Sequence, residues 1–147
     1  LIERFLRGRE ITIGVLGNGN ARVLPMLEIT YREGDVTLTF EKKERDDDFF
    51  TCPARLSAAE TGMLAKLALD AYRAAGLRDF GRIDTILTPE GPFLLEANAF
   101  AGLMCTPKEK PHSYIGFMAR AGGMGGKELL DGIVRAAAER HGLRSRA

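Results

Sequence analysis

The pattern of apolar and polar residues predicts strands in the first part of the chain. Residues 11–16 form an apolar run typical of a strand, Gly17–Asn20 forms a tight turn, and Arg22–Thr30 is expected to return as a second strand. A further turn leads into Val36–Phe40. The chain up to Phe40 is therefore predicted to form three antiparallel strands joined by short turns.

Helical spacing of apolar residues begins later in the chain. Ser57 and Glu60 have the spacing of a capping box, and the helix that they open is expected to end at Gly76. Further helices are predicted over residues 113–121 and from about 127 to 141. The apolar stripe of the last helix comprises Leu129, Leu130, Ile133, Val134 and Ala137. This order of elements favours an α+β class, with an antiparallel sheet and helices packed on one face.

A hairpin is predicted between Gly81 and Gly102, where two apolar runs flank residues 89–91. Glycine as the last loop residue suits a three-residue hairpin, because that position needs a positive φ. The resulting register places Thr88 opposite Pro92. One face of this hairpin is expected to join the core, and it carries Ile83, Thr85, Leu87, Phe93, Leu95 and Ala97.

Polar side chains share the other face of the predicted hairpin. The register pairs Asp84 with Glu96 and Arg82 with Asn98. Two carboxylates directly opposite each other repel, and a divalent cation would convert this repulsion into attraction. Asn98 would add a neutral oxygen ligand. The alternative is a solvated acidic edge without a metal.

Composition limits the classes of function. The 147 residues are 45% hydrophobic and 28% charged, which indicates a single domain, 1–147, with enough apolar residues for a core. A net charge of +1 without a basic stripe predicts no nucleic-acid partner, and no apolar run is long enough for a membrane. Cys52 and Cys105 fit no metal or redox pattern, so a reduced intracellular setting is expected. The chain begins inside a predicted strand without an initiator Met, and we expect it to be a piece of a longer protein.

Further polar residues have two interpretations each. Glu3 and Glu10 flank the first turn and either accept hydrogen bonds from ribose hydroxyls or mark an exposed strand end. Lys42 is either a phosphate contact or an ordinary surface lysine. Arg82 either binds a phosphate or a developing oxyanion, or forms a structural salt bridge with Glu96.

Several stretches together resemble a known family. IERFLRGREITIGVLG, LPMLEI, FTCPARL, LALDAYRAAGLRDFGRIDTIL and FLLEANAFAG follow one another over most of residues 1–103. They resemble the C-terminal catalytic lobe of ATP-grasp enzymes, most closely of D-alanine–D-alanine ligases. The resemblance implies the second half of an ATP-grasp fold. It also implies an ATP-dependent ligase that joins a carboxylate to an amine through an acyl phosphate, with ADP and phosphate as products.

The resemblance also implies roles for individual residues. Asp84, Glu96 and Asn98 would bind Mg²⁺ or Mn²⁺, and Arg82 would steady the transferred phosphoryl group. Gly102 would offer a backbone amide to the acyl substrate. The residues implied to contact ATP are Glu3, Arg4, Leu6, Glu10 and Lys42.

The implied partners are ATP, an amino-acid or dipeptide substrate, and N-terminal lobes that this chain lacks, with a homodimer as a further arrangement. The implied setting is the cytoplasm and peptidoglycan synthesis for the cell wall. The sequence departs from the family at Thr37 and Lys43, at Ala101, and in the stretch MCTPKEKPHSY. Two alternatives therefore remain, an ATP-grasp ligase with other amino-acid or peptide substrates and a catalytically silent nucleotide-binding module. The chain alone is not expected to catalyse the full reaction.

Overall fold

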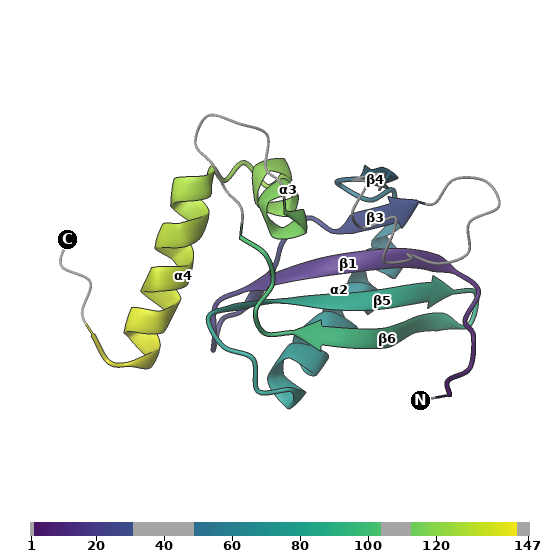
Figure 1. Ribbon diagram of the computed structural model, residues 1–147, viewed down its shortest axis with the longest axis horizontal. Helices are drawn as coiled ribbons and strands as arrows, with labels where there is room; N and C mark the ends of the chain where they lie inside the picture. The colour runs from purple at the N-terminus through teal and green to yellow at the C-terminus, as the bar shows by residue number, and fades with distance from the viewer. Residues whose placement is uncertain (1, 31–48, 104–112, 144–147) are drawn as a thin grey trace.

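The computed structural model describes residues 2–30, 49–103 and 113–143, except for the side chain of Phe49. Within these residues, an antiparallel sheet has the strand order β4-β3-β1-β5-β6, and β2 pairs with β1 (Figure 1). The strands are β1 (Arg9–Leu16), β2 (Arg22–Val23), β3 (Leu27–Thr30), β4 (Phe49–Thr51), β5 (Phe80–Thr88) and β6 (Gly91–Asn98). The predicted strand at 36–40 lies outside the described residues.

The predicted helices are confirmed as α2 (Ala58–Ala74), α3 (Tyr114–Ala121) and α4 (Gly126–Arg140). Ser57 caps α2, and the reciprocal hydrogen bonds of the capping box with Glu60 are both present. Gly76 follows this helix with φ +69°, the left-handed conformation that ends helices most readily at glycine. None of the described helices has the length and apolar composition needed to cross a bilayer.

The face of the sheet covered by α2 is apolar. Ile11 and Ile13 of β1 and Ile83 of β5 are each 0% exposed and pack with Leu64 and Ala68 of α2. These positions alternate along their strands, so they share one face. In Figure 1 the helix passes behind the sheet and leaves the opposite face toward the viewer.

A second apolar cluster lies on the opposite face, where α3 and α4 pack. It includes Leu16 of β1, Leu27 of β3, Met118 of α3 and Leu129 of α4. The α+β class with an antiparallel sheet is confirmed, and the structure refines the expected layers, because the helices cover both faces instead of one. The end of β1 already carries apolar residues on both faces, which is typical of a strand between two layers.

The expected strand Arg22–Thr30 is divided into β2 and β3. Pro25 has no backbone N–H and cannot donate to a ladder, so the pairing with β1 is interrupted there. Leu24 still donates from its backbone N–H to the carbonyl of Gly14 at 2.8 Å. The chain therefore stays against β1 while it passes the proline.

The end of α4 is held to the sheet by a polar contact. Arg140 donates through Nε and Nη2 to the two carboxylate oxygens of Asp79, at 3.0 and 2.7 Å. Asn18 donates to the same carboxylate and to the carbonyl of Ala136. The Arg140 guanidinium lowers the pKa of Asp79. The predicted stripe of α4 is wrong in part, because Val134 and Leu130 are 67% and 44% exposed.

Candidate active site

The hairpin of β5 and β6 places Asp84 opposite Glu96 and Arg82 opposite Asn98, as predicted. The loop and the ladder that produce this register differ from the expected ones. Thr88 lies opposite Gly91 instead of Pro92, so the loop has two residues. A bulge next to Asp84 makes Leu95 an additional residue on β6 and restores the predicted pairing beyond it.

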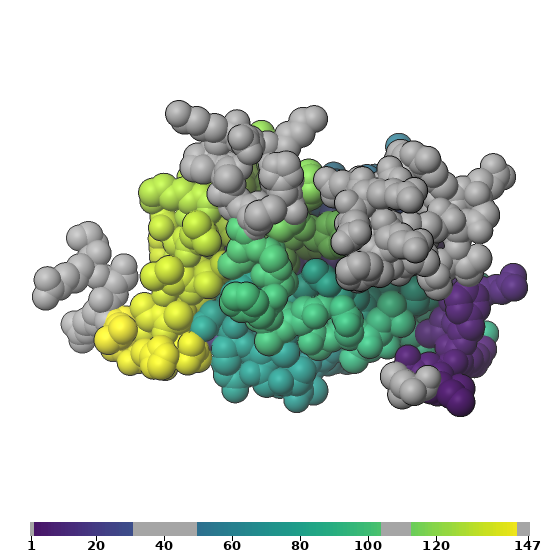
Figure 2. Space-filling view, in the orientation of Figure 1, coloured from purple at the N-terminus to yellow at the C-terminus, as the bar shows by residue number. Residues whose placement is uncertain are grey.

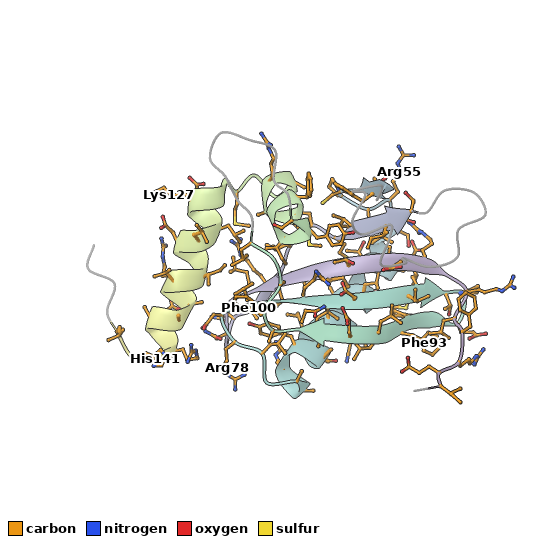
Figure 3. The ribbon with its side chains drawn as sticks, in the orientation of Figure 1. Arg55, Arg78, Phe93, Phe100, Lys127 and His141 are labelled. Carbon is orange, nitrogen blue, oxygen red and sulfur yellow. The ribbon has the colours of Figure 1, made fainter. Side chains whose placement is uncertain are left out.

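The bulge also changes which β6 side chains are covered. Phe93 and Leu95 were expected in the core and are instead 37% and 49% exposed, so this part of the prediction is wrong. Ile83, Thr85 and Leu87 are buried as expected. In Figure 3, Phe93 lies near the start of β6, and Phe100 follows shortly after its end.

Asp84 is the buried centre of the site, with 7% of its surface exposed. Its carboxylate accepts hydrogen bonds from Thr12 Oγ1 at 2.9 Å and from Asn98 Nδ2 at 3.0 Å. Arg82 donates through Nε and Nη2, the shortest contact being 2.8 Å. Burial raises the pKa of Asp84, and the contacts with Arg82 and Thr12 partly oppose this rise.

Arg82 supplies the positive charge between the two carboxylates. Its Nη2 lies 2.8 Å from Asp84 Oδ2 and 3.6 Å from Glu96 Oε1. The ion pair expected with Glu96 is therefore closer to Asp84. The guanidinium carbon also lies 5.7 Å from the centre of the Tyr114 ring on α3, which is within the range of cation–π attraction.

The donor set fits a hard divalent cation. Asp84 and Glu96 offer carboxylate oxygens, and the side chain of Glu96 is 60% exposed. Asn98 now donates through Nδ2 to both carboxylates, so its amide must rotate to offer Oδ1. In the part of the chain that is described, no group of three or more His, Cys, Asp or Glu side chains is arranged for a metal. A cation here would therefore use two carboxylates, the amide and oxygens from a second ligand.

A cavity of about 670 Å³ opens on the face of the sheet opposite α2. This volume lies in the range of small-molecule sites. The N-terminal segment that contributes to its wall lies beside the hairpin, at the opposite end of the molecule from α4 (Figure 2). The predicted site residues that line the cavity are Glu3, Arg4, Leu6, Glu10, Arg82, Asp84 and Glu96.

The other predicted residues are placed differently. Asn98 reaches the carboxylates but is not part of the cavity lining. Gly102 is exposed between β6 and α3, and an added Cβ there would come within 3.8 Å of Ser113. Lys42 lies outside the described residues, as do the departures at Thr37 and Lys43.

Several cavity residues had not been predicted. Thr12 follows Glu10 by two positions in a strand, so alternation could have placed it on the same face. Leu94 and Leu95 reach the cavity through the bulge, which has no clear signal in the sequence. Tyr114 comes from a helix far along the chain, and only the tertiary fold brings it to Arg82.

Known proteins that are similar to this chain in sequence, and known proteins that are similar to it in fold, include D-alanine–D-alanine ligases. A D-alanine–D-alanine ligase of Bordetella avium is 39% identical over 136 residues, covering 91% of this chain and 41% of that protein. One from Bordetella petrii is 40% identical over 140 residues, covering 94% and 41%. The chain thus spans about two fifths of the length of these curated relatives.

Solved structures share the fold. The D-alanine–D-alanine ligase of Coxiella burnetii superposes with a TM-score of 0.74 at 26% identity, over 95% of this chain and 34% of that one. The Bacillus anthracis ligase, solved in complex with ATP, gives 0.72 over 95% and 41%, and at 22% identity it shows the fold alone. The antiparallel sheet and its helices are therefore those of the C-terminal domain of such ligases.

The family model for the C-terminus of D-ala D-ala ligases matches residues 1–135. This chain belongs to that family.

Proposed function

We propose that this chain forms the ATP- and Mg²⁺-binding part of a ligase that joins D-alanine, or a related amino acid, to a second amine. The observation that carries the proposal is the placement of Asp84 opposite Glu96, with Arg82 between them, at the wall of a cavity of about 670 Å³. The names of the curated relatives support the D-alanine substrate.

Asp84, Glu96 and Asn98 would hold the metal ion in this proposal. When bound, Mg²⁺ offsets the negative charge of the ATP phosphates and orients them. Arg82 faces the same cavity and presents a fork of donors, so it would bind the oxygens of the transferred phosphoryl group. Its present contacts with both carboxylates show that it can reach the centre of the site.

The nucleotide would occupy the part of the cavity beside the N-terminal segment. Glu3 and Glu10 would accept hydrogen bonds from ribose, while the backbone of Arg4 and Leu6 would meet the adenine. Leu94 and Leu95 add apolar surface on the β6 side. Lys42 would contact a phosphate of ATP. The backbone amide of Gly102 would bind the acyl substrate.

The proposed reaction has two transfers. A carboxylate oxygen of the first amino acid attacks the γ-phosphorus of ATP, and ADP leaves. The neutral amine of the second amino acid then attacks the acyl carbon, phosphate leaves, and the amine loses a proton as the peptide bond forms. The protein chiefly positions these reactants. We further propose N-terminal lobes, a homodimer, a cytoplasmic location and use of the product in peptidoglycan as the setting of this activity.

The test is ADP release by the intact protein with Mg²⁺ and D-alanine. Asp84→Asn and Glu96→Gln should each abolish release, because both weaken the hold on the metal. Asp70→Asn is the matched control, because that exposed carboxylate pairs with Lys66 on α2, away from the cavity. Normal turnover by Glu96→Gln would rule out the metal role.

Two other results would redirect the proposal. ADP release with other amino acids or dipeptides, but not with D-alanine, would indicate a ligase of different specificity. Binding of Mg-ATP in a calorimeter without ADP release for any amino acid would indicate a nucleotide-binding module.

A further inference from the structure

Thr12 is a buried polar residue that the proposed reaction does not use. It lies in β1, between Leu27 of β3 and Asp84 of β5. It is among the residues that line the cavity, although it is 0% exposed. The hydroxyl donates to Asp84 Oδ1 at 2.9 Å. Thr12 is therefore fixed by the sheet and directed at the central carboxylate of the site.

The hydrogen bonds to Asp84 differ in whether they can remain when ATP and the metal ion bind. Among the described residues, its carboxylate accepts hydrogen bonds from Thr12, Arg82 and Asn98. Arg82 is assigned to a phosphoryl group and Asn98 to the metal, so both must rearrange. The backbone of Thr12 belongs to a central strand and cannot shift without disturbing two ladders.

The two oxygens of Asp84 are also used differently. Oδ1 accepts hydrogen bonds from Thr12 Oγ1 at 2.9 Å and from Arg82 Nε at 3.0 Å, whereas Oδ2 accepts them from Asn98 Nδ2 at 3.0 Å and from Arg82 Nη2 at 2.8 Å. Oδ2 is thus the oxygen that contacts Asn98, another member of the proposed metal site. A hydrogen bond from Thr12 to Oδ1 fixes the plane of the carboxylate and thereby the direction of Oδ2.

We infer that Thr12 is a positioning residue that holds the Asp84 carboxylate in the orientation needed to bind the divalent cation. The inference rests on the proposed function, because it assumes that Asp84 is a metal ligand. Partners of metal ligands typically change metal affinity about 10–100-fold when they are removed. A role limited to structure would lower stability and leave metal affinity of the folded protein unchanged.

Thr85 provides a matched control on the neighbouring strand. It is also 0% exposed, and its Oγ1 also donates a hydrogen bond, to the carbonyl of Ile11 at 2.7 Å. Alternation turns Thr85 toward α2, away from Asp84. Thr12→Val and Thr85→Val therefore remove the same hydroxyl from equally buried sites, and only the first contacts the candidate metal ligand.

The experiment measures binding of Mn²⁺ to the intact protein in the presence of ADP, from the decrease in the electron paramagnetic resonance signal of free Mn²⁺. Thr12→Val should weaken Mn²⁺ binding about 10–100-fold. Thr12→Ser keeps the hydroxyl donor, so its Mn²⁺ affinity should stay within about threefold of that of the wild type. Thr85→Val should lower the unfolding temperature and leave Mn²⁺ affinity unchanged.

The results separate the inferred role of Thr12 from the proposed metal role of Asp84, on which it rests. Unchanged Mn²⁺ affinity in Thr12→Val, together with loss of binding in Asp84→Asn, overturns the role of Thr12 and leaves the proposed function standing. Unchanged affinity in Asp84→Asn overturns the metal role itself. If Thr12→Val does not fold, Thr12→Ala and Thr12→Ser give the same contrast, because both lack the γ-methyl and differ in the hydroxyl; equal affinities of these two overturn the inference.

Discussion

The two faces of the central strands are built from neighbouring residues and serve different purposes. On one face, Ile11 and Ile83 are buried against α2. On the other, Thr12 and Asp84 contribute to the cavity. Consecutive residues thus belong alternately to the apolar layer and to the candidate site. Rigid burial on one side holds the polar groups of the other side in place, and the two faces should respond differently to substitution.

Apart from the proposed metal ligands, the largest expected effect comes from Arg82 on the cavity face. Arg82→Ala should lower kcat about 100–1000-fold, because in the proposed reaction it removes a preorganised donor to the transferred phosphoryl group. Arg82→Lys should fall between this variant and the wild type, since an ammonium keeps the charge without the planar fork. Steady-state ADP release in the intact protein measures both.

Arg78→Ala is the control for this prediction. Arg78 is exposed before β5, it is not among the residues that line the cavity, and Figure 3 labels it. Equal losses of kcat in Arg78→Ala and Arg82→Ala would contradict the assignment of Arg82 to the reaction.

The opposite behaviour is expected for the face that α2 covers. Leu64 is 0% exposed in the apolar cluster beneath the sheet. Leu64→Ala should lower the free energy of unfolding by about 3 kcal/mol, because it removes buried methyl groups and leaves a cavity. Urea denaturation measures the loss, and Mn²⁺ affinity of the remaining folded protein should not change. A large loss of Mn²⁺ affinity would show that the two faces are not independent.

A smaller effect is expected where α3 meets β1, on the same face as the cavity. A Cβ at Gly14 would lie 3.0 Å from atoms of Leu24, Ile115 and Met118. Gly14→Ala should therefore destabilise the protein by about 2 kcal/mol through overpacking. The control is Gly62→Ala in α2, where nothing lies within 4 Å of an added Cβ. It should stabilise the helix by up to about 1 kcal/mol, and a loss of stability there would contradict this account.

The smallest expected effect concerns the pH dependence of stability in metal-free buffer. Asp84 and Asp79 should contribute to this pH dependence with opposite signs. Burial raises the pKa of Asp84, so its contribution to stability is present below the unfolded pKa of about 3.9 and is lost as pH rises through the folded pKa. Arg140 lowers the pKa of Asp79, so its contribution is present above about 3.9 and is lost as pH falls through the folded pKa.

Unfolding free energies across the acidic range test this difference. With rising pH, the wild type should lose stability relative to Asp84→Asn and gain stability relative to Asp79→Asn. Asparagine suits the second site, because it tolerates the φ of +67° found at Asp79. Differences of the same sign for both variants would contradict the assigned causes.

Local sequence rules predicted much of the fold and the strand pairing at the centre of the candidate site. The expected hairpin register placed Asp84 opposite Glu96, although the structure reaches this pairing through a shorter loop and a bulge, and the capping box placed the start of α2. The bulge at Leu95 was missed, because two adjacent leucines give no local signal for an additional residue. The division of the expected strand at Pro25 did have a signal in the sequence, because proline lacks the N–H that a ladder needs. The prediction of one continuous strand did not take this into account.

The other errors arose from contacts between distant segments. The predicted stripe of α4 included Leu130 and Val134, which are exposed because the docking angle of the helix decides which apolar residues are covered. The contact of Tyr114 with Arg82 likewise depends on how α3 packs against the sheet. Such arrangements follow from the packing of whole elements, and a periodic pattern within one element does not contain them.

The bulge in β6 has a consequence for variation in the hairpin. A three-residue loop with an unbroken ladder and a two-residue loop with one additional residue at Leu95 both place Glu96 opposite Asp84. The outer part of the hairpin can therefore slip by one position, or change in length by one residue, while the carboxylate pair keeps its alignment. Natural insertions and deletions near Pro89 are accordingly expected to be tolerated more readily than those between Leu95 and Asn98.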